Sequence, residues 1–185
     1  MSMPFTVSRI PVDKDGKPTF DPHRASEVYQ SVKGIRGRII EAALRVETDL
    51  TATILCYLVG GQNSVQNKLR EFIFDAEFCT FMQKRKMLSK IFDIDGSEIN
   101  YKSAIEAKQL RRCINEIILV RNKYAHGEIV VDCTDYKPYI KYYSNGTQEE
   151  LIDPEIVQEF EMKCLRIHEE LSELFIFFKE KDISA

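Results

Sequence analysis

One six-residue segment of this sequence, Arg121 to His126 (Arg-Asn-Lys-Tyr-Ala-His), combines side chains suited to phosphodiester chemistry. On a helix, Asn122 and His126 are four residues apart and share a face, and Arg121 lies about 140° around the helix axis from His126, so both border one groove. Histidine can act as a general base or acid near neutral pH. Arginine can bind a phosphate through two hydrogen bonds and neutralise charge that builds up in a transition state. Arg121 and His126 are therefore candidate catalytic residues, and Asn122 would orient the imidazole or donate to the phosphate.

This set of side chains suits metal-independent cleavage of RNA, because the 2′-hydroxyl of the substrate can be the nucleophile. No metal, cofactor or protein nucleophile is expected. The three histidines, His23, His126 and His168, are too widely spaced to suggest a metal site, and the five cysteines contain no Cys-x-x-Cys pair. Three cysteines lie on apolar stripes of expected helices and should fill the core: Cys56, Cys113 and Cys164.

A structural interpretation of the same segment stays open. Arg121 lies on an otherwise apolar stripe, where uncompensated burial would cost several kcal/mol, so it needs an acid, a dimer partner or a phosphate. Arg121 would then pair with Glu41 or Glu47, and His126 would cap the C-terminal end of its helix.

Two further residues of the segment are candidates for substrate binding. Lys123 could reach an RNA phosphate and Tyr124 could stack on a base, although Lys123 could equally be solvated and Tyr124 could pack on Val120, four residues before it. A group of tyrosines and lysines further along the chain could form an aromatic surface for RNA, or could simply pack as strand residues: Tyr136, Lys137, Tyr139, Lys141, Tyr142 and Tyr143.

Apolar residues that recur every three or four positions predict the helices that position these side chains. Asp21-Pro22 starts the first helical segment, which is expected to fray or bend near Gly34 and Gly37. The helix that carries the motif begins near Ser103, ends at Gly127 and is apolar around most of its circumference, which favours a place in the middle of a bundle. The expected helices cover residues 36–59, about 65–73, 81–92, about 103–126, and a last long stretch from Asp153-Pro154 onward.

A period of two replaces the helical period after Gly127, and Asn145-Gly146 is a strong hairpin signal. Residues 128–152 are therefore expected to form a small antiparallel β-hairpin insertion between the last two long helices, and residues 1–20 an N-terminal arm. The expected fold is mainly α, a helical bundle of about five helices in a single domain spanning residues 1–185.

Composition limits the class of protein. The 185 residues are 44% hydrophobic and 30% charged, and 26 basic against 29 acidic side chains leave a net charge of −3. Such a chain is not a polycation that coats nucleic acid. No apolar stretch approaches the roughly 18 to 20 residues of a membrane span, and the N-terminus does not resemble a secretory signal. A cytoplasmic protein is expected.

Residues 121–126 resemble the Arg-Asn-x-x-x-His motif of the HEPN (higher eukaryotes and prokaryotes nucleotide-binding) superfamily. The resemblance extends over about residues 35–127, where a long helix with Glu41 and Glu47 precedes the motif at the end of an apolar central helix. It implies a dimeric helical bundle and a metal-independent ribonuclease, a hydrolase of toxin–antitoxin or defence systems. Arg121 and His126 would be catalytic and Asn122 supporting, with two copies of the site meeting across a homodimer cleft.

The alternative is a regulatory protein without catalysis. Relatives of the mannitol operon repressor type carry a similar Arg-Asn-x-x-Ala-His ending, and such a module would act through a protein partner or nucleotide binding. The partners expected on the first hypothesis are RNA and an antitoxin or regulatory protein.

Overall fold

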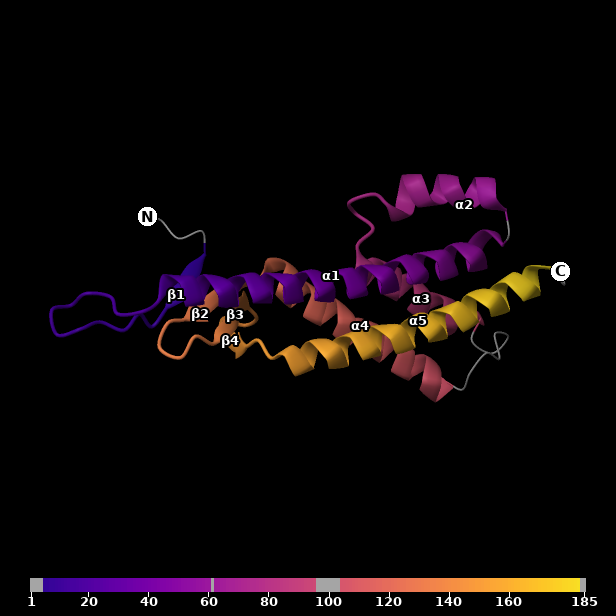
Figure 1. Ribbon diagram of the computed structural model, residues 1–185. Helices are drawn as coiled ribbons and strands as arrows, with labels where there is room; N and C mark the ends of the chain where they lie inside the picture. The colour runs from indigo at the N-terminus through magenta and orange to yellow at the C-terminus, as the bar shows by residue number, and fades with distance from the viewer. Residues whose placement is uncertain (1–4, 61, 96–103, 184–185) are drawn as a thin grey trace. The chain divides into compact units, whose positions relative to one another are not determined.

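The computed structural model describes residues 5–60, 62–95 and 104–183 (Figure 1). Within these ranges the chain forms five α-helices, one short π-helical segment and four strands. The protein is mainly helical with a small sheet, as predicted. No helix in the described ranges is both long and apolar enough to cross a membrane.

Helix α1 (Pro22–Val59) begins and ends where the sequence predicts. The Asp21 carboxylate accepts hydrogen bonds from the backbone amides of His23 and Arg24 at 2.8 and 3.4 Å, which caps the first turn. At the other end, Gly60 has a φ of 57°, a conformation that glycine adopts without steric cost.

The expected interruption of α1 near Gly34 and Gly37 is absent, because the helix is continuous through both glycines. Each glycine costs about 1 kcal/mol relative to alanine in a helix interior. Val32 and Ile39, on either side of them, are buried. Burial of this face offsets the low intrinsic helix propensity.

Two of the remaining helices begin with caps that side chains close in sequence provide. Thr80 and Gln83 form the predicted reciprocal capping box, with N–H···O distances of 2.7 and 3.4 Å. Asp153 accepts from the amide of Glu155 at 2.9 Å at the start of the last helix, whereas the predicted cap Ser103 lies outside the described residues. The elements are α2 (Asn63–Leu69), the π-helical η1 (Arg70–Phe74), α3 (Phe81–Asp95), α4 (Ala104–His126) and α5 (Pro154–Ile183).

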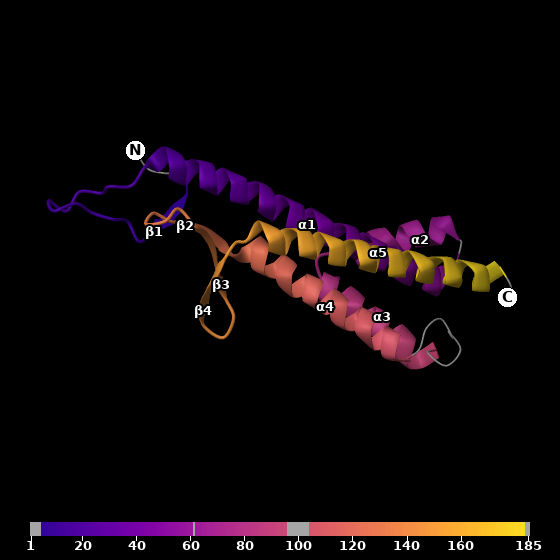
Figure 2. The ribbon, with the colours of Figure 1, turned by 60° about the horizontal axis from the view of Figure 1, so that its bottom comes forward.

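The four strands form one mixed sheet in the order β1-β2-β3-β4. Strands β2, β3 and β4 are successive antiparallel neighbours (Figure 2), whereas β1 pairs in parallel with β2. The prediction of a simple antiparallel hairpin was therefore wrong in this respect, because the N-terminal arm supplies an extra, parallel strand. The bounds are β1 (Thr6–Ser8), β2 (Glu128–Asp132), β3 (Pro138–Tyr143) and β4 (Thr147–Leu151).

The chain forms two compact units. The sheet unit contains the chain up to Glu41 together with Val120–Phe160, and the helical unit contains Ala42–Leu119 together with the chain from Glu161 onward. Helices α1, α4 and α5 each contribute residues to both units. The six-residue motif lies entirely in the sheet unit.

The core of the helical unit consists mainly of aliphatic side chains from α1, α3, α4 and α5. Leu50, Leu88, Ile114 and Leu171 have no measurable exposure. Helices α1 and α5 are further joined by a hydrogen bond from Thr53 Oγ1 to the carbonyl of Leu171 at 3.2 Å. Cys56 and Cys164 are buried, as predicted for core-filling thiols, whereas Cys113 is half-buried.

The core of the sheet unit combines buried side chains of the sheet with those of the helix segments of that unit. Its buried residues include Ile129, Val131 and Ile140 from the strands, and Tyr124 from the end of α4. Val32 and Ile39 of α1 are buried in the same unit. This core fixes the end of α4, where the motif lies.

Candidate functional site

The last two turns of α4 carry the predicted catalytic side chains. Asn122 and His126 are exposed, and Arg121 is half-buried. Since residues four apart share a helical face, Asn122 and His126 present an amide and an imidazole to solvent on the same side of α4. Helix α4 ends at His126, and the buried Gly127 leads directly into β2.

Arg121 is oriented by its neighbour. Its Nη1 atom donates to Oδ1 of Asn122 at 3.0 Å, which draws the guanidinium toward the face that carries His126. Within the described part of the sheet unit, no carboxylate pairs with Arg121, and its buried Nε atom has no hydrogen-bond partner. A half-buried guanidinium that no described carboxylate of its unit neutralises can bind an anion such as a phosphate.

The two glutamates considered as structural partners of Arg121 lie on α1. Glu47 forms an ion pair with Lys84 of α3 at 2.9 Å, and the Lys84 side chain is only 8% exposed. That pair satisfies the carboxylate of Glu47 within the helical unit. Glu41 also takes part in an interaction, so its carboxylate is not free.

Lys123 is held by the protein itself. Its Nζ atom forms an ion pair with Oε2 of Glu150 on β4 at 2.5 Å and lies 5.5 Å from the centre of the Tyr142 ring. The hydroxyl of Tyr142 donates to the other oxygen of Glu150. Burial alone would raise the pKa of Glu150, but the hydrogen bonds from Lys123 and Tyr142 and the charge of Lys123 hold it below its ordinary value. Lys123 is therefore ion-paired with the sheet in this structure.

Tyr124 does not present its ring to solvent. The residue is 2% exposed, and burial raises the pKa of its hydroxyl. A base cannot stack on this ring in the present conformation, so the packing alternative describes Tyr124 better than base stacking. Of the predicted site residues, Arg121, Asn122 and His126 therefore lie together at the end of α4, whereas Lys123 is ion-paired and Tyr124 is buried.

The expected aromatic surface for RNA does not form a continuous face. Tyr139 and Tyr143 alternate with Tyr142 along β3, so Tyr142 lies on the opposite side of the sheet. The hydroxyl of Tyr136 accepts from the backbone amide of Asp21 at 2.7 Å, and its ring lies under the guanidinium of Arg24. The two lysines of the group are paired with carboxylates, Lys137 with Asp135 at 2.9 Å and Lys141 with Glu149 at 3.6 Å.

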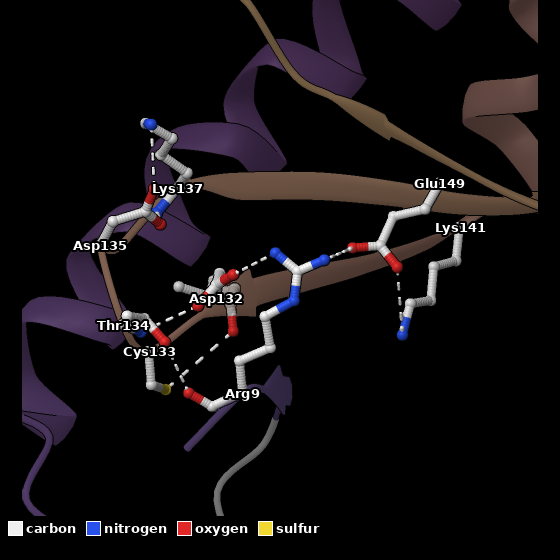
Figure 3. Close-up of polar contacts among 9 residues, drawn as sticks. Arg9, Asp132, Cys133, Thr134, Asp135, Lys137, Lys141 and Glu149 are labelled. Atoms are coloured by element: carbon white, nitrogen blue, oxygen red, sulfur yellow. Dashed lines mark hydrogen bonds and ion pairs between the residues drawn. The ribbon is translucent and has the colours of Figure 1, made fainter. Parts of the chain in front are cut away.

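A second charged cluster lies on the sheet and is centred on Arg9 (Figure 3). Its guanidinium donates to the buried carboxylate of Asp132 at 2.7 Å and approaches that of Glu149 at 3.7 Å. The backbone carbonyl of Arg9 also accepts from the hydroxyl of Thr134 at 3.0 Å. Because opposite charges meet within the cluster, its role is to fasten the end of β1 to the rest of the sheet.

Sequence reasoning missed one residue beside the motif, Arg36 of α1. Its Nη2 atom donates to the backbone carbonyl of Ala125 at 2.6 Å. This contact joins α1 to the last turn of α4 within the sheet unit. No local spacing signals it, because the acceptor is a main-chain atom 89 residues away.

Comparisons of this chain with models of known protein families, with curated proteins and with solved structures find no match. The chemistry of the site therefore has to be inferred from its own residues.

Proposed function

We propose that this chain is a HEPN-like, metal-independent endoribonuclease that acts as a homodimer on RNA, with Arg121, Asn122 and His126 in its active site. The observation that carries the proposal is the exposure and pairing of the motif side chains at the end of α4. An imidazole and an amide are exposed on one face, and the neighbouring half-buried guanidinium has no carboxylate partner in the described part of the sheet unit. These groups are the ones that cleavage through the substrate's own 2′-hydroxyl requires.

In the proposed reaction, His126 removes the proton of the ribose 2′-hydroxyl as a general base. The 2′-oxygen attacks the adjacent phosphorus, an O2′–P bond forms, and the bond between phosphorus and the 5′-oxygen breaks. Arg121 neutralises the charge on the non-bridging oxygens in the transition state. A protonated imidazole gives the leaving 5′-oxygen its proton, which yields a 2′,3′-cyclic phosphate and a 5′-hydroxyl.

The reaction uses a base and an acid on opposite sides of the phosphorus, whereas each chain supplies a single histidine in this motif. A second copy of the chain would supply the second His126. The proposal therefore includes a homodimer in which two helix ends face a shared cleft.

The test is RNA cleavage in EDTA by the wild-type protein, His126→Ala and Arg121→Ala, with the oligomeric state measured by light scattering on the same samples. His23→Ala is a matched control, because His23 is also exposed and belongs to the same unit. We expect cleavage by the wild type and the control, with 2′,3′-cyclic phosphate ends, and its loss in both motif variants. Cleavage that disappears in EDTA, or survives His126→Ala, would contradict the proposal.

A second candidate is a binding module without catalysis. It is favoured by one observation on the two residues expected to hold RNA: Lys123 is ion-paired with Glu150, and Tyr124 is buried. Intact RNA at high protein concentration, with all variants folded and dimeric, would support this alternative over the ribonuclease.

A further inference from the structure

The hydrogen bond from Arg36 to the Ala125 carbonyl lies at the C-terminal end of α4, where backbone carbonyls lack hydrogen-bond donors within the helix. At the end of α4, the carbonyl of Lys123 accepts from the amide of Gly127 at 2.8 Å. The carbonyl of Ala125, immediately before His126, accepts from Arg36 at 2.6 Å instead. A cation is also favourable at this end of the helix dipole.

Arg36 is itself held in place by the packing of α1. Val32 and Ile39, which lie four residues before and three after it, are on the same side of the helix and are buried. The Arg36 side chain is half-buried. The backbone of α1 that carries the guanidinium is therefore fixed in position, and the side chain reaches the end of α4 from there.

The residue on the other side of His126 is constrained as well. A Cβ atom added at Gly127 would lie 2.7 Å from Cγ1 of Ile140 on β3, so the backbone of Gly127 lies directly against the sheet. His126 is thus placed between Ala125, which is held by Arg36, and Gly127, which is packed on β3. Its own side chain is exposed.

We propose that Arg36 is a positioning residue for His126: by fixing the Ala125 carbonyl, it sets the direction in which the imidazole leaves the end of α4. This inference rests on the proposed ribonuclease function for its kinetic consequence, although its structural part can be tested alone. Arg36 acts through the backbone and does not need to touch the substrate. Its loss should reduce kcat with little change in KM.

The kinetic test compares wild type with Arg36→Met, which keeps an aliphatic stem without a donor, and with Arg36→Lys, which keeps a charged donor. Misplacement of a catalytic group by about 1 Å can cost about 100-fold in rate. We expect kcat to fall by about 10- to 100-fold in Arg36→Met, with partial recovery in Arg36→Lys. Arg24→Met is the matched control, since Arg24 lies on the same helix and stacks on Tyr136 away from the motif. Its kcat should stay within about twofold of wild type, because it leaves the imidazole where it is.

A second readout separates this inference from the proposed function. In full-length protein, the NMR signals of the His126 ring and the hydrogen exchange of backbone amides at residues 125–128 should change in Arg36→Met and not in Arg24→Met. If the wild type cleaves no RNA, the proposed function fails, but these signals still decide the role of Arg36. Unchanged ring signals and exchange in Arg36→Met would overturn the inference, as would a raised KM with unchanged kcat, which would place Arg36 on the substrate.

Discussion

Replacement of Gly127 by alanine should destabilise the protein, although Gly127 does not have the positive φ that usually favours glycine at the end of a helix. The added Cβ would lie 2.5 Å from the carbonyl oxygen of Lys123, and 2.7 and 2.8 Å from Cγ1 and Cδ1 of Ile140. One of the three contacts is with backbone, which cannot move aside without disturbing the bond that closes the last turn of α4. Overpacking of this kind typically costs about 1–3 kcal/mol.

Two other glycines provide controls of opposite sign. An added Cβ would meet no atom within 4 Å at Gly34 or Gly37, and both lie inside α1. Gly34→Ala and Gly37→Ala should therefore each stabilise the protein by about 0.5–1 kcal/mol. The free energy of unfolding of all three variants can be measured by urea denaturation followed by circular dichroism.

The cause of the Gly127→Ala effect can be isolated with a second substitution. Ile140→Ala removes both side-chain atoms that the new Cβ would meet, so the double variant should be less destabilised than the sum of the single variants. The expected coupling lies between about 0.5 and 3 kcal/mol. If Gly127→Ala proves as stable as the wild type, or is stabilised like the α1 variants, the close approach between α4 and β3 is not what requires glycine here.

Removal of one partner of the partly buried pair between Lys84 and Glu47 should cost about 1–3 kcal/mol in urea unfolding, and more in Glu47→Ala, which leaves the buried Lys84 ammonium unpaired, whereas replacement of both by apolar residues should be nearly neutral. If the loss of unfolding free energy in the double alanine variant equals the sum of the two single losses, the pair does not contribute as inferred. Burial raises the pKa of Cys164 to about 12, so iodoacetamide should label this thiol only after unfolding; rapid labelling of the native protein, seen by mass spectrometry, would disprove this. Hydrogen bonding from Lys163 holds the pKa of Glu116 below its ordinary value, so the stability from this pair is present above the unfolded-state pKa and is lost as pH falls through the folded-state pKa. Glu116→Gln should flatten the acid limb of the stability curve, and parallel acid limbs for variant and wild type would contradict the linkage.

The features that could be predicted from the sequence are those set by neighbouring residues. Asp21, Asp153 and the pair Thr80–Gln83 cap helices because their side chains reach amides two or three positions away. Such bonds depend on spacing alone. The same local logic failed at Gly34, because burial of one face of α1 by tertiary contacts outweighs the propensity of a single residue.

The features that could not be predicted depend on residues far apart in the chain. Arg36 is one of several basic residues on α1, and nothing in its spacing distinguishes it as the donor to Ala125. Similarly, nothing in the spacing of Lys123 indicates that Glu150 of β4 is its ion-pair partner. The motif residues could be predicted from the order of residues in the sequence. The protein groups that contact them could not.

The parallel pairing of β1 with β2 has a consequence for how the chain folds during synthesis. Thr6 is paired in register with Val130, and the side chains of Arg9 and Asp132 meet across 123 positions. The first strand therefore has no partner until most of the chain has left the ribosome, and contacts of such large sequence separation form slowly. Docking of the N-terminal arm should be among the last steps in folding. Strands β2, β3 and β4 would therefore pack against the end of α4 before β1 joins the sheet.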